Sequence, residues 1–351
     1  MGIEKTPFGS TPDGQDVSLF ALTNQNGMQV KITNYGGTIT SVLVPDKHGR
    51  ISDVVLGFDD LDSYIQGCPY FGCIIGRVGN RLAGAKFEMD AKTYQLAQNN
   101  GPNHLHGGEY GFDKRVWDVV EHPSKDGGVL ELHYASPDGE EGYPGNLDVI
   151  VSYTLTPDNE IKIRYRASTD CKTPVNLTNH TYFNLKDAGK SDILDHRLQL
   201  YAREFTPIDE NLIPEGEIRS VHSTPLDFTE PKSIGRDIEQ DHVQLRRAGG
   251  FDHNYVIDGK SGELRLAACV TEPESGRMLK VLTKEPGIQF YSGNFLDGTL
   301  TGKGGAVYKK RHGLCLETQH YPDSPNQPNF PSIILLPEDS YDTTTVYKFS
   351  V

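Results

Sequence analysis

The feature that most constrains the fold is the succession of short β-strand patterns along nearly the whole chain. Runs of alternating or β-branched apolar residues are separated by turn sequences such as Pro137-Asp138-Gly139 and Thr156-Pro157-Asp158-Asn159. Proline and glycine in such turns interrupt regular structure, so each run is short. The clearest runs predict strands at 17–22, 28–33, 38–44, 130–134, 147–155, 161–166, 197–201, 263–270, 278–282, 288–291, 314–317 and 344–349.

Helical patterns are few and short by comparison. The best windows are residues 61–66 and 233–240, and the second follows Pro231 and has Ser233 as its predicted N-cap. Because strands follow strands without helices between them, we do not expect a β-α-β architecture. We therefore expect an all-β fold with few short helices: one domain over residues 1–351, built as a large antiparallel β-sandwich, with a strand-switching barrel as the alternative.

Charge and cysteine content limit the partners of the chain. Its 34 lysines and arginines against 48 aspartates and glutamates give a net charge of −14, which disfavours nucleic acid and favours a neutral substrate. No apolar run approaches the ~20 residues of a membrane-spanning helix, and no secretory signal is evident at the N-terminus. Five scattered cysteines without a C-x-x-C pair are typical of reduced thiols. We expect a cytoplasmic protein with no membrane partner.

One segment, PVNLTNHTYFN at residues 174–184, combines an apolar and a polar set of side chains. If it is a strand, its alternating apolar residues face the core and the row with His180 at its centre faces the other way. Uncharged hydrogen-bonding groups around one histidine suit a polar binding site better than an open surface, which usually carries lysine and glutamate. A structural histidine in a large β protein is the alternative interpretation.

A second segment, GLCLETQHYP at residues 313–322, places a carboxylate at the end of an apolar strand. Leu314 and Leu316 share one face, whereas Cys315, Glu317 and Gln319 share the other. Desolvation there would raise the pKa of Glu317, which makes it a candidate general base. The alternative is a carboxylate paired with an arginine or a lysine.

Further polar residues lie among glycines and apolar residues in four other segments. Asparagine, arginine, histidine, aspartate and glutamine side chains can donate to and accept from the several hydroxyls of a hexose. The chain lacks a dinucleotide-binding G-x-G-x-x-G turn and a Walker sequence, so nucleotide cofactors are not expected. The residues concerned are Asn80, Arg81, His106, Asp252 and Gln289.

Taken together, these segments resemble the aldose 1-epimerase, or galactose mutarotase, family in their order and spacing. The resemblance covers residues from the seventies to the late 320s and rests on GRVGNRL, NHLHGG, DGEEGYPGNL, TPVNLTNHTYFNL, GGFDHNYV, GIQFYSGNF and LETQHYPDSPNQP. It implies a β-sandwich that interconverts the α and β anomers of free hexoses such as galactose and glucose, with the sugar in a groove.

Carried over by position, the resemblance assigns a role to each candidate residue. His180 would be the general acid and Glu317 the general base. Neither a cofactor nor a metal would be required. The residues holding the substrate would be Asn80, Arg81, His106, Asp252 and Gln289.

Three other interpretations stay open at this point. His104-x-His106 followed by Glu109 imitates the ligand cluster of a metal-dependent cupin, although its spacing is wrong. A sugar sensor on the same scaffold could bind a hexose without catalysis, and a hexose-6-phosphate epimerase would need a cationic phosphate site. We expect a monomer or weak dimer. The sequence does not rank galactose against glucose, nor decide whether Tyr321 contacts the sugar or a loop closes over it.

Overall fold

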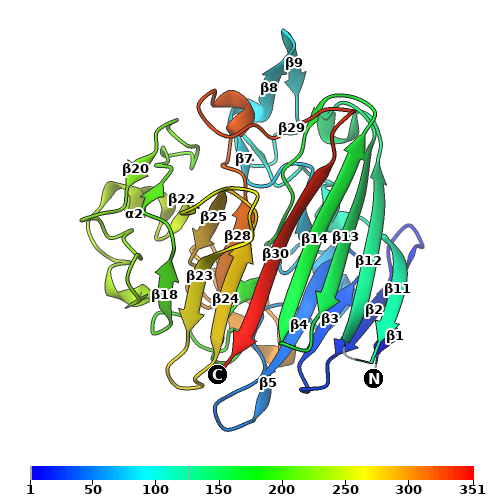
Figure 1. Ribbon diagram of the computed structural model, residues 1–351, viewed down its shortest axis with the longest axis vertical. Coiled ribbons are helices and arrows are strands. Elements are labelled where there is room, and N and C mark those ends of the chain that lie inside the picture. Colours follow the sequence, from blue (N-terminus) through cyan, green and yellow to red (C-terminus); the bar gives the residue numbers. More distant parts are fainter. Residues whose placement is uncertain (1, 126) are drawn as a thin grey trace.

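A nine-stranded antiparallel sheet forms one layer of the molecule. The computed structural model describes residues 2–125 and 127–351, and this sheet crosses the front of Figure 1 in the order β11-β12-β13-β14-β30-β24-β23-β18-β21. Its strands are β11 (Asp118–Ser124), β12 (Gly127–Ser136), β13 (Leu147–Leu155), β14 (Glu160–Thr169), β30 (Tyr341–Ser350), β24 (Met278–Thr283), β23 (Arg265–Thr271), β18 (Arg197–Leu200) and β21 (Lys232–Ser233).

Two further antiparallel sheets lie behind the first one in the view of Figure 1. The five-stranded sheet runs in chain order through β1 (Ile3–Ser10), β2 (Asp16–Thr23), β3 (Gln29–Thr33), β4 (Thr38–Pro45) and β5 (Ile51–Asp53). The six-stranded sheet has the order β17 (Tyr182–Phe183), β28 (Leu314–Gln319), β25 (Gly287–Tyr291), β22 (Asp252–Val256), β19 (Glu204–Phe205) and β20 (Arg219–Ser220). The predicted antiparallel β-sandwich is confirmed.

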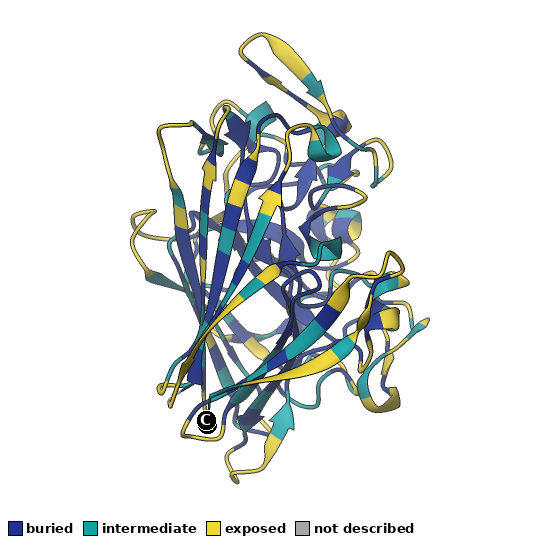
Figure 2. Ribbon diagram, turned by 90° about the vertical axis from the view of Figure 1, so that its right-hand side faces the viewer, coloured by how far each residue is buried: buried dark blue, intermediate teal, exposed yellow. Residues whose placement is uncertain are grey.

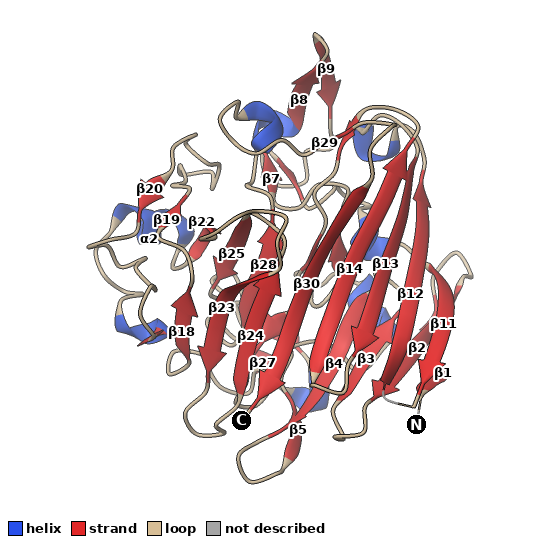
Figure 3. Cartoon of the chain, viewed as in Figure 1, coloured by secondary structure: helices blue, strands red, loops and turns tan. Residues whose placement is uncertain are grey.

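Short strand pairs and helical turns complete the fold (Figure 3). The pairs are β6 (Ile74–Ile75) with β16 (Thr178–Asn179), β7 (Arg81–Leu82) with β10 (His104–Leu105), β8 (Lys86–Met89) with β9 (Lys92–Gln95), β15 (Thr173–Pro174) with β29 (Ile334–Leu335), and β26 (Leu300–Thr301) with β27 (Val307–Tyr308). The helices are α1 (Leu61–Ile65) and α2 (Val243–Ala248), besides the 3₁₀ turns η1 (Ala83–Ala85), η2 (Phe112–Lys114), η3 (Glu140–Gly142), η4 (Ile234–Arg236), η5 (Lys303–Gly305) and η6 (Ser324–Asn326). No helix among the described residues is long and apolar enough to span a membrane.

Every run predicted as a strand overlaps an observed strand, but one of the two helix predictions is wrong. The window at 61–66 forms α1, where the Asp60 side chain accepts a hydrogen bond from the Ser63 N–H. In the window at 233–240, Ser233 makes no side-chain cap and pairs with Arg197 in the nine-stranded sheet, so only the short turn η4 follows it. The helix α2 begins later, after His242, and ends at Gly249, whose φ of 66° suits glycine.

Residues 174–184 are not one continuous strand as predicted. Their three short strands pair with three different partners, because β15 joins β29, β16 joins β6 and β17 joins β28. The alternation of faces nevertheless persists along the segment. Val175, Leu177 and Phe183 lie in the main core, whereas the rings of His180 and Tyr182 stack with centroids 5.1 Å apart.

The main hydrophobic core lies between the nine-stranded sheet and the other two, since it draws residues from all three (Figure 2). Strand β25 contributes Ile288 and Phe290 to this core, and β28 contributes Leu314 and Leu316. Side chains between them point to the opposite face of the six-stranded sheet. Every residue of β25 and β28 is buried, so this second face is covered as well. The polar residues of these strands are therefore held away from bulk water.

Phe290 tests this division of faces. It contacts Phe228 and Phe251 in the core, so Phe290→Ala is expected to lower the free energy of unfolding by about 3–5 kcal/mol. Lys280→Ala, at an exposed position of β24, serves as the control and is expected to change it by less than about 0.5 kcal/mol. Urea denaturation measures both, and equal small effects would contradict the assignment of Phe290 to the core.

Candidate active site

The register of the six-stranded sheet brings candidate residues from separate segments side by side. Gln289 on β25 lies directly opposite Glu317 on β28, and Asn254 on β22 lies opposite Gln289 on its other side. Asp252 opens β22, and its carboxylate Oδ1 accepts a 2.7 Å hydrogen bond from the Gln289 Nε2. Since alternate residues share a face, these side chains form one polar row across the sheet.

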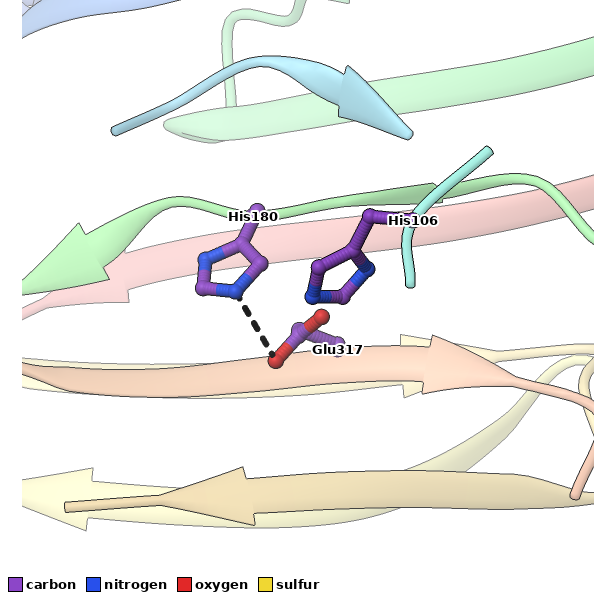
Figure 4. A group of neighbouring side chains, drawn as sticks. All are labelled: His106, His180 and Glu317. Atoms are coloured by element: carbon purple, nitrogen blue, oxygen red, sulfur yellow. Dashed lines mark ion pairs between the residues drawn. The ribbon is translucent and has the colours of Figure 1, made fainter. Parts of the chain in front are cut away.

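His180 meets Glu317 above this row. The Nε2 of His180 lies 3.6 Å from Oε1 of Glu317, and Figure 4 shows the imidazole, on the connection between β16 and β17, facing the carboxyl on β28. Both residues are deeply buried, with 5% of His180 and 2% of Glu317 exposed. The second carboxyl oxygen of Glu317, Oε2, has no hydrogen-bond partner within the described chain. Oε1 of the carboxyl therefore lies beside the imidazole, and Oε2 is free to accept a proton or a hydrogen bond.

Aromatic rings and a thiol fix the orientation of His180. Tyr182 and Tyr70 both lie nearly parallel to the imidazole, at centroid distances of 5.1 and 5.7 Å. Sγ of Cys315 lies 3.6 Å from the Nδ1 of His180, on the side of the ring away from Glu317. The ring is thus confined between the two tyrosines, and each of its nitrogens has a defined neighbour.

His106 is held next to His180 by a turn in which the Asn80 main chain takes part. Asn80 and His106 both have positive φ, of 60° and 52°, and the Nδ1 of His106 accepts a 3.1 Å hydrogen bond from the Asn80 N–H. Because Nδ1 accepts, the proton of the neutral imidazole lies on Nε2. Strand β7, which follows Asn80, pairs with β10, which precedes His106, and this pairing holds the two turns together. His106 therefore presents an N–H donor.

Arg81 supplies the positive charge of the site. Its Nε donates a 3.1 Å hydrogen bond to Oδ1 of Asn100, which orients the guanidinium. Burial raises the pKa of both Asp252 and Glu317, and the charge of Arg81 opposes this rise, so it lies within electrostatic reach of both carboxyls. A guanidinium within reach of two buried carboxyls is a suitable partner for several oxygen atoms of a polar ligand.

Burial shifts the two central groups toward their neutral forms. Desolvation, followed by the nearby Asp252 charge, raises the pKa of Glu317 well above its ordinary value, and Arg81 opposes this only in part. Desolvation also lowers the pKa of His180 to about 4. Both shifts favour the neutral carboxyl with the neutral imidazole over the carboxylate with the imidazolium.

The structure thus brings together all seven residues singled out in the sequence. The arrangement supports His180 and Glu317 as a proton-transferring pair, with hydrogen-bonding groups on either side. Residues that the sequence did not single out also belong to the surroundings. Asn100 and Tyr70 lie in irregular loops without periodicity, and only the alternation along residues 313–322 pointed to Cys315 and Gln319.

The cupin interpretation is wrong, because the neighbouring histidine faces elsewhere. The Nδ1 of His104 is 2.8 Å from the Ala97 carbonyl and its Nε2 is 2.8 Å from the hydroxyl of Tyr143. Trp117, the single tryptophan of the chain, is fully buried in the main core and is therefore a packing residue.

Three potential metal ligands nevertheless meet in the site. Ligand atoms of His106, His180 and Glu317 lie within 4.8 Å of one another (Figure 4). A metal-bound histidine normally donates from its other ring nitrogen to an acceptor. In His106 that relation is reversed, because Nδ1 accepts from a main-chain N–H and Nε2 must keep its proton. The geometry favours a hydrogen-bonding site over a metal site.

Comparison with known proteins finds relatives that match nearly the whole length of the chain. The family model described as Aldose 1-epimerase matches residues 18–348. The curated "Galactose mutarotase" of Bos taurus is 49% identical over 352 residues, and the match covers 100% of this chain and 99% of the bovine chain. The "Aldose 1-epimerase" of Escherichia coli (strain K12) is 40% identical over 349 residues, and the match covers 99% of both chains. The crystal structure of an aldose epimerase homologue from C. elegans has a TM-score of 0.87 at 32% identity, covering 95% of this chain and 99% of its own.

The hydrogen bond to His106 leads to an expectation about metals. Zinc or manganese added at a small excess should leave the thermal midpoint unchanged, since a ligand that binds only the folded state would raise it. Purified protein should carry less than about one-tenth equivalent of any transition metal by mass spectrometry of the elements. A stoichiometric metal, or a rise in the midpoint that His106→Ala abolishes, would contradict this interpretation.

Proposed function

The chain belongs to the aldose 1-epimerase family, and on this premise we propose that Glu317 and His180 act as base and acid in interconverting the α and β anomers of a free hexose. The observation that supports this proposal most strongly is the 3.6 Å contact between the His180 imidazole and the Glu317 carboxyl. A proton donor and a proton acceptor from distant parts of the sequence here face one small volume. The roles of the remaining residues follow from the same geometry.

The reaction is a ring opening followed by reclosure. A base removes the proton from the anomeric hydroxyl O1 while an acid protonates the ring oxygen O5, and the bond between C1 and O5 breaks to leave an aldehyde. Rotation about the bond between C1 and C2 presents the other face of the carbonyl. On closure, the group that took the proton from O1 returns it, and the group that protonated O5 takes its proton back. The product is the opposite anomer, with no net gain or loss of protons or electrons.

Ring opening changes the protonation of the pair in a direction that burial favours. Before opening, Glu317 is a carboxylate and His180 an imidazolium; afterwards the carboxyl and the imidazole are both neutral. Desolvation stabilises this second state, because it raises the pKa of Glu317 and lowers that of His180. The charged pair is thus the less stable state of the site, which makes Glu317 a strong base and His180 a strong acid when the sugar is bound.

The surrounding residues are suited to hold the hydroxyls of the sugar. His106 donates from Nε2 and Arg81 from its guanidinium, and both can stabilise the negative charge that develops on sugar oxygens. Asp252 accepts from hydroxyl groups, and its orientation is fixed by Gln289. Asn80 acts through its main chain on His106. These contacts fix the ring so that O1 and O5 reach the pair.

The charges of the site favour an unphosphorylated sugar. Arg81 is accompanied by the buried carboxyls Asp252 and Glu317, so the positive charge is already matched. A phosphate would need further cations to offset its two negative charges. The relatives named galactose mutarotase make galactose the first sugar to examine.

Removal of either member of the pair is expected to abolish most of the activity. His180→Asn and Glu317→Gln keep the size and polarity of the side chains but cannot transfer the proton, so kcat should fall about 10²-fold or more in each. Polarimetry of freshly dissolved α-galactose measures the rate. Circular dichroism and thermal midpoints close to those of the parent chain are the control for folding. A rate within about threefold of the parent for either variant would remove that residue from the mechanism.

The pH dependence of kcat/KM is expected to be bell-shaped with a wide plateau. Activity requires one proton on the pair, so it falls when a second proton is added to His180, near its pKa of about 4, as the pH is lowered. It falls again as the pH rises through the raised pKa of Glu317, because the last proton is then lost. Rates at constant ionic strength, with circular dichroism at each pH, give the profile. An acid limb near histidine's ordinary value of about 6.5 would contradict the assignment.

A further inference from the structure

The backbone of β28 places two side chains of the same face at the two nitrogens of one imidazole. Cys315 and Glu317 are two residues apart, a separation of about 7 Å along a strand. Glu317 lies beside the Nε2 of His180 and Cys315 beside its Nδ1, each at 3.6 Å. Pairing between Tyr182 and Cys315 joins β17 to β28 at this point, which fixes the ring relative to both side chains. One strand thus contacts both ends of the proposed acid.

Cys315 is the side chain that contacts the Nδ1 of His180. Within residues 2–125 and 127–351, no other side chain hydrogen-bonds with this nitrogen; the ring also forms a hydrogen bond with the main chain of His180 itself, which opposes the fall of its pKa. Cys315 is fully buried, and desolvation together with the Glu317 charge raises the pKa of its thiol well above the ordinary value. The sulfur therefore stays a neutral thiol, which is a weak acceptor and a weak donor.

We propose that Cys315 is a positioning residue for the reaction: its Sγ accepts the Nδ1–H of His180 and thereby keeps Nε2 as the nitrogen that exchanges its proton with the sugar. The nitrogen of a histidine that carries the proton is set by the hydrogen bond that the other one makes. With Nδ1–H directed at sulfur, Nε2 is protonated in the imidazolium and bare after the transfer. The side of the ring that faces Glu317 and the sugar is then the reactive one.

A thiol in this place also keeps the imidazolium strongly acidic. In many enzymes a carboxylate or carbonyl accepts from Nδ1 and stabilises the charged ring. O5 is an ether-type oxygen and a poor base, so its protonation needs a strong acid. A neutral sulfur orients the ring without adding a negative charge that would hold the proton. Among the described residues, Glu317, His106, Tyr70 and Tyr182 also lie against the ring, and of these four Glu317 is the one that can provide a negative charge near neutral pH.

Two substitutions of Cys315 with different expected effects test the inference. Cys315→Ala removes the side-chain acceptor, so the Nε2–H tautomer of neutral His180 gains population and kcat should fall about tenfold with little change in KM. Cys315→Ser replaces sulfur with a stronger oxygen acceptor. It should retain the Nδ1–H tautomer and most of kcat, and it should move the acid limb of the pH profile to higher pH because the imidazolium is stabilised. Cys269→Ala, which removes a thiol from β23 in the nine-stranded sheet, is the matched control and should leave both properties unchanged.

The decisive readout is the protonation of the His180 ring nitrogens in ¹⁵N-histidine-labelled protein, with His180→Asn used to assign the signals. In the parent chain and in Cys315→Ser, Nδ1 should carry the proton and Nε2 should be bare at neutral pH; in Cys315→Ala the two forms should mix. Unchanged ring signals and unchanged kcat in Cys315→Ala would overturn the inference, as would an Nε2–H tautomer in the parent chain. Changed ring signals with unchanged kcat and an unshifted acid limb would equally overturn it.

The inference rests on His180 being the acid of the proposed function, and the experiment separates the two. If His180→Asn keeps its activity, the proposed function fails whatever the ring signals show. If His180→Asn is inactive but Cys315→Ala matches the parent in tautomer and rate, the inference about Cys315 alone fails.

Discussion

The whole site depends on the two faces of strand β28. Leu316 points into the core between the sheets, and the neighbouring Glu317 points to the opposite face, where His106 lies beside it and Arg81 is within electrostatic reach. The same apolar packing that stabilises the sandwich therefore fixes the position of the carboxyl and withholds water from it. Desolvation of Glu317 and His180 follows from this burial. It raises the pKa of the carboxyl and lowers that of the imidazole, which favours transfer of a proton to Glu317 and from His180.

Such a site contains buried polar atoms without hydrogen-bond partners, which lower the stability of the fold. Several atoms on or next to this face are buried without a hydrogen-bond partner in the described chain, namely Glu317 Oε2, Gln319 Oε1, Asn254 Nδ2 and Thr178 Oγ1. Each such atom costs about 1–3 kcal/mol. A large core spread over three sheets offsets this cost. Concentration of these atoms around one carboxyl is what a binding site for a hydroxyl-rich ligand requires.

The sequence predicted the strand positions and the main site residues, but it did not predict the strand pairing of residues 174–184 or the loop contacts of the site. Strand positions followed from periodicity, because residues such as Leu314 and Leu316 alternate with polar ones and the alternation is a local property. The break of residues 174–184 into three strands was not foreseeable, since it depends on which distant strand each piece pairs with. Neither the turn that sets the His106 tautomer nor the stacking of Tyr70 on His180 left a pattern in the sequence, because both arise from loops packed by tertiary contacts.

The most direct test of the central claim is a crystal structure of the Glu317→Gln variant with galactose bound. The account requires a single sugar ring to lie against both groups, with O5 within hydrogen-bond distance of Nε2 of His180 and O1 within reach of the side chain at position 317. It also requires Arg81 and Asp252 to contact other oxygens of the same ring. A galactose bound with its anomeric carbon turned away from His180, or on another surface of the molecule, would contradict it.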